Sequence, residues 1–241
     1  MEVFHPKHRD RNCGDLYRDD VSMEQKILVP LLLVLLSCTF CAADFPPLET
    51  PEYTVLKTGK DFEIRSYKEA VWAVAMVDDF SFVHATQAGF HRLFQYIEGG
   101  NHNWTKIPMT APVLTGIVPS AGPFCSSAFA VRFYVPPKFR NAPPTPLEEL
   151  DITFEHWDER TVAVRTFPGY AKDDNVPQEA EKLSISLSNS DFAKDSIYPI
   201  EGLDSYAIAQ YSGPFQIFNR KNEVWVNIKL DNKTSGVTAS S

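Results

Sequence analysis

The sequence predicts an α+β fold: a distorted antiparallel β-barrel built from two β-β-α-β-β-like repeats with two flanking helices. Most apolar segments are short and alternate with polar residues, as half-buried strands do. Two segments have helical spacing instead, and the order of strand pair, helix and further strands occurs twice along the chain. The 18 prolines favour turns and strand edges over long helices. We expect closure into a barrel because closure removes exposed strand edges.

The first repeat begins with three short strands. Residues 53–67, YTVLKTGKDFEIRSY, form two strands about a turn at Gly59-Lys60. The segment FEIRSY alternates apolar and charged residues, the pattern of a strand with one buried face. Residues 70–77, AVWAVAMV, are rich in strand-forming residues and more continuously apolar, which predicts a third strand.

The pattern then changes to helical spacing over residues 80–98. Asp79 or Ser81 can cap the start of this helix, and Gly99-Gly100 ends it. A connection follows, in which Met109 is free to pack under the helix or to contact a ligand. The apolar stripe of the helix consists of Val83, Thr86, Phe90, Leu93 and Ile97.

Strands at 110–118 and 128–136 complete the first repeat, and the second repeat follows the same plan. It has two strands within 151–170, a helix, and two closing strands within 205–213 and 222–230. The second helix carries its apolar face on Val176, Ala180, Leu183 and Leu187.

The N-terminal 43 residues predict an extension with a secretory signal peptide. Lys26 precedes an apolar run from Ile27 that ends in small residues at Ala43, as in a signal peptide before its cleavage site. The signal proper is assigned to 23–43, with Met23 as an alternative start. An uncleaved anchor is the alternative; after cleavage we expect no stable membrane span. The expected location is extracellular or apoplastic, with the vacuole as a second option.

The mature chain is then a folded domain, 44–231, followed by a disordered polar tail, 232–241. Sequons at Asn103 and Asn232 fit passage through the secretory route. Cys125 would be the one cysteine left, so the domain must be held by its core without an internal disulfide.

Composition and motifs argue against two classes of function. The formal net charge is −8, and no Lys/Arg cluster is interleaved with aromatic residues, so nucleic acid is not an expected partner. The sequence contains no nucleophile elbow, phosphate loop, HExxH or CxxC pair. Cys125 has no assignable base, which favours a passive thiol. We therefore do not expect an enzyme.

Two segments are candidates for ligand contact. On the first helix His91 lies with Gln87 and Gln95 beside the apolar stripe, either as a solvated face or as the floor of a groove. Phe94 is displaced from the stripe, so its ring can belong to the core or line a pocket. Arg220 and Lys221 supply positive charge just before the last strand. They can form ion pairs at the end of the strand, or they can recognise an anionic group of a ligand.

Five motifs carry a family likeness. FEIRSY, GFHRLFQYIEG, KIPMTAPV, FPGYAKDDN and NRKNEVW occur in the order of the SOUL haem-binding family, which the chain resembles over about residues 50 to 229. The likeness is to its haem-binding protein 2-like branch, including secreted plant members. The resemblance implies non-enzymatic binding, sequestration or transport of haem or a related tetrapyrrole.

The resemblance also implies a pocket between the first helix and the loop before the last strand. His91 is the candidate axial ligand of the haem iron. Because this chain has glutamines where some members have basic residues, a secreted interaction module with a vestigial pocket is the alternative. Carried onto this chain, the haem-contacting surface comprises Gln87, Phe90, His91, Phe94, Gln95, Phe215 and Gln216, with Arg220 facing the propionates.

Overall fold

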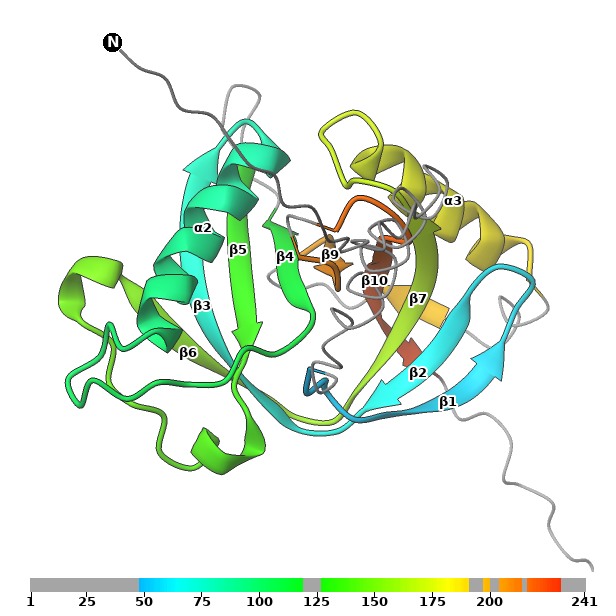
Figure 1. Ribbon diagram of the computed structural model, residues 1–241. Helices are drawn as coiled ribbons and strands as arrows, with labels where there is room; N and C mark the ends of the chain where they lie inside the picture. The colour runs from blue at the N-terminus through cyan, green and yellow to red at the C-terminus, as the bar shows by residue number, and fades with distance from the viewer. Residues whose placement is uncertain (1–47, 119–126, 191–196, 200–203, 214–215, 231–241) are drawn as a thin grey trace, which may run out of the picture. The chain divides into compact units, whose positions relative to one another are not determined.

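The computed structural model describes residues 48–118, 127–190, 197–199, 204–213 and 216–230 (Figure 1). Phe215, Cys125, Asn232, the signal segment and the polar tail lie outside these ranges. Within the described residues, no helix has the length and apolar character needed to cross a bilayer.

The elements follow the predicted order. The first repeat contains β1 (Tyr53–Thr58), β2 (Glu63–Tyr67), β3 (Ala70–Asp79), α2 (Phe82–Ile97), β4 (Val113–Val118) and β5 (Ser127–Tyr134). After the 3-10 turns η1 (Pro137–Phe139) and η2 (Glu148–Leu150), the second contains β6 (Ile152–Trp157), β7 (Arg160–Pro168), α3 (Val176–Ser188), β8 (Ile197–Pro199), β9 (Tyr206–Gln210) and β10 (Lys221–Leu230). Every predicted strand and both helices are confirmed; β8 and the 3-10 turns were not predicted.

The strand order confirms the duplication. The described strands form one antiparallel sheet in the order β1-β2-β7-β10-β9-β4-β5-β3-β6, with β8 paired to β10. Read outward from the central pair β4–β9, the order β5-β3-β6 on one side matches β10-β7-β2 on the other. Each strand of one repeat therefore takes the place of its counterpart in the other, and the sheet has a pseudo-twofold axis between β4 and β9.

The predicted closed barrel is not confirmed, because the sheet is open. β1 and β6 are its edges, and no strand pairing within the described ranges joins them. The sheet nevertheless curves strongly. Two-residue links, 68–69 and 158–159, connect β2 to β3 and β6 to β7, although these strands lie in opposite halves of the sheet (Figure 1). Because Tyr67 pairs with Arg160 and Ala70 with Trp157, the two links run side by side and antiparallel. Within the described ranges, no pairing between β1 and β6 closes the sheet.

Both helices pack on the same face of the sheet. Helix α2 contacts β3 and β5, and α3 contacts the equivalent strands β7 and β10. The predicted apolar face of α3 is confirmed, with Val176 and Leu183 buried and Ala180 and Leu187 packed beside them. On α2 the buried face is shifted from the predicted stripe and consists of Phe82, Ala85, Gly89, Leu93, Tyr96 and Ile97.

The opposite face of the sheet is buried as well, which corrects the one-sided reading of FEIRSY. Arg65 of β2 is only 5% exposed, and Glu223 of β10 is fully buried. The curvature explains this, because strands from both halves enclose the face opposite the helices. That enclosed core includes Tyr67, Trp72, Leu114, Tyr134, Val164 and Trp225.

Candidate ligand-binding groove

Helix α2 begins as the sequence predicts. Ser81 is the N-cap, and its hydroxyl accepts a hydrogen bond from the His84 amide at 3.2 Å. The carboxylate of Asp173, from the connection before α3, accepts from the Ser81 hydroxyl at 2.9 Å and from the Phe82 amide. These bonds fix the first turn of α2 against the second repeat.

A glycine sets the depth of α2 on the sheet. A Cβ atom at Gly89 would lie 2.4 Å from a methyl of Val131 on β5, a distance that real Cβ atoms do not adopt. The helix can therefore approach β5 closely only because this residue has no side chain. With Gly89 facing the sheet, the outer side of the helix carries Gln87, Phe90 and Phe94.

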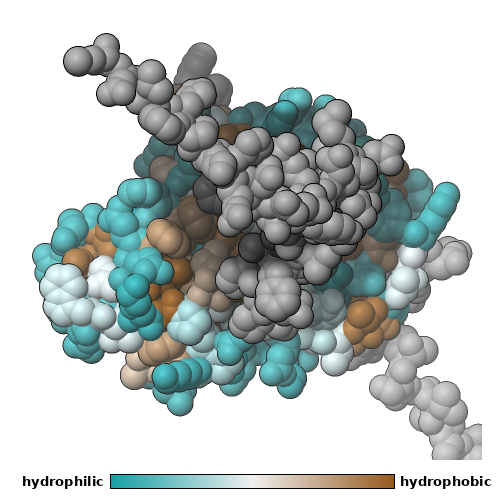
Figure 2. Space-filling view, viewed as in Figure 1, coloured by the Kyte–Doolittle hydropathy of each residue, from teal (hydrophilic) through white to brown (hydrophobic). Residues whose placement is uncertain are grey.

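A groove of about 370 Å³ runs along this outer side of α2. Its second wall is the end of β9 and the segment after it, and its third is the connection that enters β4. Apolar surface is visible in Figure 2 where Figure 1 places α2. The groove is lined by Leu48, Thr86, Gln87, Phe90, Phe94, Met109, Thr110, Ala111, Val113, Gln210, Tyr211, Ser212, Gly213 and Arg220.

The helix wall is aromatic. The rings of Phe90 and Phe94 stack with centroids 5.8 Å apart and an interplanar angle of 28°. Phe94 remains 44% exposed, an uncommon state for a phenylalanine of a packed helix. The two rings form a flat apolar surface of the kind that planar ligands contact.

The connecting segment forms the third wall. The main chain at Glu49 pairs in parallel with Thr110, and the Ala111 amide donates to the Glu49 carbonyl at 2.9 Å. This pairing brings Leu48 into the groove. Met109 lines the groove, as one of its two predicted options, and is half-buried. Leu48 was missed because nothing local in the sequence indicates a pairing across about 60 residues.

The structure brings together only part of the predicted site. Gln87, Phe90 and Phe94 line the groove. His91 and Gln95 do not: both are exposed, and the Gln95 amide lies 2.8 Å from Nδ1 of His91. An α-helix advances about 100° per residue, so His91 and Gln95 lie about 40° and about 80° beyond Gln87, at and past the edge of the groove wall.

The predicted role of Arg220 changes. It lines the groove, but its Nη1 donates to the carbonyls of Gly213 at 2.8 Å and Gln216 at 2.7 Å, and its Nη2 to that of Ser212 at 3.3 Å. Its guanidinium also lies 4.1 Å above the ring of Tyr170. Arg220 therefore holds the loop carbonyls through Nη1 and Nη2, while its Nε has no hydrogen-bond partner among the described residues.

Gln216 is likewise occupied with its own loop. Its side-chain amide donates to the carbonyls of Phe218 and Asn219, both at 3.1 Å, and it is not among the lining residues. Lys221 forms the strand-end ion pair that was one of its two readings, with Nζ 2.9 Å from Glu223.

Tyr211 lines the groove, and its phenol is neutral. Its Oη donates to Glu223 at 2.7 Å. Burial and the adjacent Glu223 carboxylate raise the pKa of Tyr211 well above its ordinary value. The phenol therefore keeps its proton at any physiological pH.

The sequon at Asn103 lies on an ordered turn. Buried Asn101 fixes this turn, because its side-chain amide donates to the carbonyls of Tyr96 and Thr105, and its oxygen accepts from the Thr105 amide. Asn103 itself is exposed. The turn is thus sterically open at the asparagine, while glycosylation there stays a prediction.

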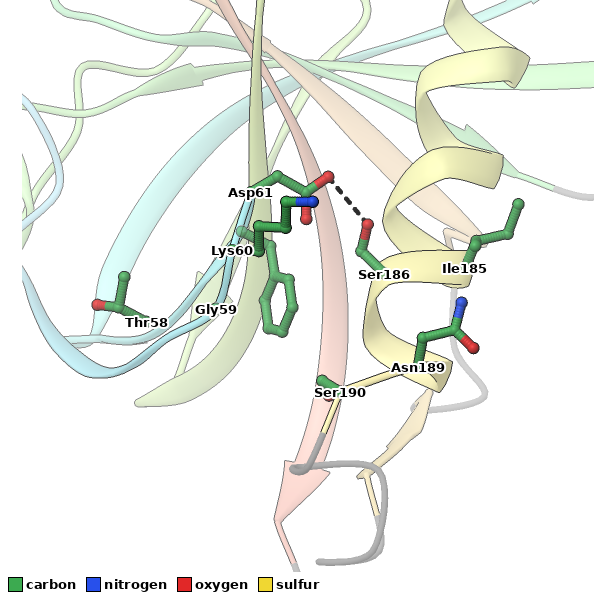
Figure 3. Close-up of a pocket in the computed structure, with 9 residues that line it drawn as sticks. Thr58, Gly59, Lys60, Asp61, Ile185, Ser186, Asn189 and Ser190 are labelled. Carbon is green, nitrogen blue, oxygen red and sulfur yellow. Dashed lines mark hydrogen bonds between the residues drawn. The ribbon is translucent and has the colours of Figure 1, made fainter.

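A larger cavity, about 580 Å³, lies between the β1–β2 turn and the end of α3 (Figure 3). Its walls include Lys60, Asp61 and Asn189, and the Ser186 hydroxyl donates to Asp61 at 2.9 Å across it. The Asp61 carboxylate also pairs with Arg165. This cavity lacks the paired aromatic wall of the α2 groove, and its polar groups tie α3 to the hairpin.

Comparison with known proteins identifies the family. The sequence model described as "SOUL heme-binding protein" matches residues 48–227, so the chain belongs to the SOUL family. It is 34% identical to human Heme-binding protein 2 over 186 residues, covering 77% of this chain and 86% of that one. Mouse Heme-binding protein 1 is 27% identical over 186 residues, covering 76% and 94%.

One solved structure shares the fold at low identity. A chain of the EcmrR–DNA complex aligns with a TM-score of 0.51 and 10% identity, covering 85% of this chain and 65% of that one. At this identity the similarity concerns the fold alone. The family membership, in contrast, supports haem as the bound ligand.

Proposed function

We propose that this protein binds haem or a related tetrapyrrole in the α2 groove, without transforming it. The observation that carries the proposal is the stacked Phe90–Phe94 wall, which lines one groove with Tyr211, Gly213 and Arg220 in a chain of the SOUL family. A tetrapyrrole is a broad apolar disc and is best held by flat apolar contact with a few polar groups at the rim.

The groove residues fit such a ligand. Leu48, Met109 and Val113 extend the apolar surface of the helix wall. Gln87, Gln210 and Ser212 offer uncharged donors that suit the propionate carboxylates. Because Arg220 is committed to the loop, binding depends on apolar contact more than on charge pairing.

Binding without chemical conversion is supported by the hydrogen bonds of two threonine hydroxyls in the groove. The Thr86 hydroxyl lies 3.1 Å from that of Thr115, and the Thr110 hydroxyl donates to the Tyr134 carbonyl at 2.7 Å. These bonds are structural, and neither hydroxyl is paired with a base that would make it a nucleophile.

Titration of the purified protein with haemin tests the proposal. We expect a saturable Soret change with one haem per chain, and the same saturation by fluorescence with metal-free protoporphyrin. Absence of saturable binding for both ligands would refute the proposal.

A second candidate is a secreted interaction module with a vestigial pocket. It is favoured by the neutral Gln87 and Gln210 in the groove and by the commitment of Arg220 to loop carbonyls. Protein partners captured equally well with and without haemin, together with a flat haemin titration, would support this reading over the first.

We further propose that the protein enters the secretory pathway and is glycosylated at Asn103. The apolar run after Lys26 and the exposed sequon support this. Expression in a eukaryotic host should give a medium fraction whose mobility shifts on glycosidase treatment, with the shift reduced in Asn103→Gln. Retention of an unglycosylated chain in the cytosol would contradict it.

A further inference from the structure

We propose that Met109 ligates the iron of the bound haem through its thioether sulfur. The inference rests on the proposed function and names the iron ligand of the same groove. It replaces His91, which was expected in that role from the sequence.

The main chain on both sides of Met109 is anchored, and Met109 lines the groove while packing partly against the core beneath α2. Before it, the Ile107 amide donates to the Ile97 carbonyl at the end of α2 at 2.8 Å. After it, Thr110 is buried and bonded to Tyr134, and Ala111 is bonded to Glu49. The thioether thus projects from a fixed segment, and its unbranched chain lets the sulfur adjust to a ligand.

The donor chemistry of the groove favours Met109. Proteins hold haem iron through histidine, cysteine, methionine or tyrosine. Among the described groove residues, Met109 and Tyr211 belong to this set. The Tyr211 hydroxyl is engaged with Glu223 and keeps its proton, so the phenolate that iron requires is not formed.

His91 is poorly placed by comparison. It is exposed, lies outside the groove lining, and has Nδ1 in contact with the Gln95 amide. A thioether is a soft ligand and raises the reduction potential of the iron that it binds. A methionine ligand would therefore favour the ferrous state of the bound haem.

The test compares the wild-type chain with Met109→Leu, which keeps the apolar volume and removes the sulfur. For the haem complexes, iron K-edge absorption should show a sulfur neighbour in the wild type and none in the variant. The Soret band of the reduced complex should shift, and the reduction potential should fall. Metal-free protoporphyrin should bind both proteins equally, because it has no iron to ligate.

Two control variants test a nearby histidine and the cysteine expected to remain in the mature chain. His91→Ala and Cys125→Ser should keep the sulfur neighbour and the wild-type potential. Loss of the signal in either of these, or an unchanged signal and potential in Met109→Leu with haem bound, would overturn the assignment. That outcome leaves the proposed function standing, since haem is still bound; failure of the wild type to bind either porphyrin would remove both. Met109→Ile serves as a second sulfur-free variant if Met109→Leu loses its thermal transition.

Discussion

The guanidinium of Arg65 on β2 reaches across β7 and donates to both carboxylate oxygens of Glu223 on β10, each at 3.1 Å. Tyr211 and Trp225 donate to the same carboxylate at 2.7 and 2.8 Å. Tyr211 is also a groove residue. The buried ion pair therefore holds the sheet and one wall of the groove together.

Removing the charge of Glu223 should destabilise the fold. In Glu223→Gln the guanidinium of Arg65 loses its buried counter-ion and keeps the Nε ion pair with the partly exposed Glu63. Breaking a buried pair costs about 3–5 kcal/mol, and Glu63 places the expected loss at the lower end of that range. Chemical denaturation followed by circular dichroism measures this loss. Glu52→Gln is the matched control, because the Lys68–Glu52 pair is exposed and its loss should be nearly silent. An equal effect of both variants would contradict the prediction.

The same carboxylate predicts a pH dependence of stability. Burial alone would raise the pKa of Glu223, but Arg65 and the hydrogen bonds to the carboxylate outweigh it and hold that pKa below its ordinary 4.5. In the unfolded chain the group binds its proton at higher pH than in the folded one. This contribution to the free energy of unfolding is therefore complete above the ordinary value and is lost as pH falls through the folded pKa. Denaturation midpoints measured from pH 6 downward should fall less steeply in Glu223→Gln.

Gly89→Ala should weaken the packing of α2. The added methyl would meet Val131 at 2.4 Å, and overpacking of this kind costs about 1–3 kcal/mol. This outweighs the helix-propensity gain of about 1 kcal/mol. Thermal denaturation checks the sign. Ala88→Ser, at an exposed neighbouring position, should change stability by about 0.5 kcal/mol or less; a stabilised Gly89→Ala would show that α2 can move away from β5.

Phe94→Ala should weaken ligand binding while leaving stability nearly intact. The ring is 44% exposed in the free protein, and a ligand in the groove would cover that exposed part. Loss of part of a phenyl contact corresponds to about tenfold weaker binding, for haemin and metal-free protoporphyrin alike. Phe80→Ala removes a ring that is 84% exposed and lies outside the groove lining. Equal affinities in the two variants would mean that the ligand binds elsewhere.

Gln87→Lys should strengthen haemin binding at low ionic strength. The new cation would sit in the groove wall, where the proposed ligand's propionate would otherwise meet a neutral amide. A partly exposed pair of this kind contributes about 0.2–1 kcal/mol. The gain should disappear near 1 M salt, where the screening length is about 3 Å. Gln95→Lys carries the same charge on the same helix outside the groove, and a gain of the same size there would show a non-specific charge effect.

Local patterns in the sequence predicted most of the fold. Ser81 caps α2 and Gly99 follows its last turn, as expected from residue type alone. The twofold order of strands also emerged from the repeated pattern. The predicted closure of the sheet into a barrel was not confirmed. Closure depends on whether β1 and β6 pair, and neither strand carries a local signal for its partner. The burial of Arg65 was missed because its buried partner, Glu223, lies 158 residues away and leaves no local signal near Arg65.

The candidate site was predictable where one helix defines it. Gln87, Phe90 and Phe94 follow from helical spacing. His91 lies only about 40° from Gln87 on the same spacing, so its place outside the groove lining needed the structure. Arg220 was found by its charge and does line the groove. Its hydrogen bonds to main-chain carbonyls were not foreseen, because such partners leave no trace in the sequence. Phe215 lies outside the described residues.

The pseudo-twofold sheet has a consequence for stoichiometry. Counted from the first residue of each helix, Phe90 and Phe94 of α2 correspond to Ser184 and Ser188 of α3. Where the first repeat stacks two aromatic rings, the second has two small hydroxyls, and the Ser188 hydroxyl donates to the Ser184 carbonyl of its own helix. The two halves thus share a framework, but only the first has a flat aromatic surface on its helix. If the proposed function holds, the symmetric sheet predicts one ligand for each chain and not two.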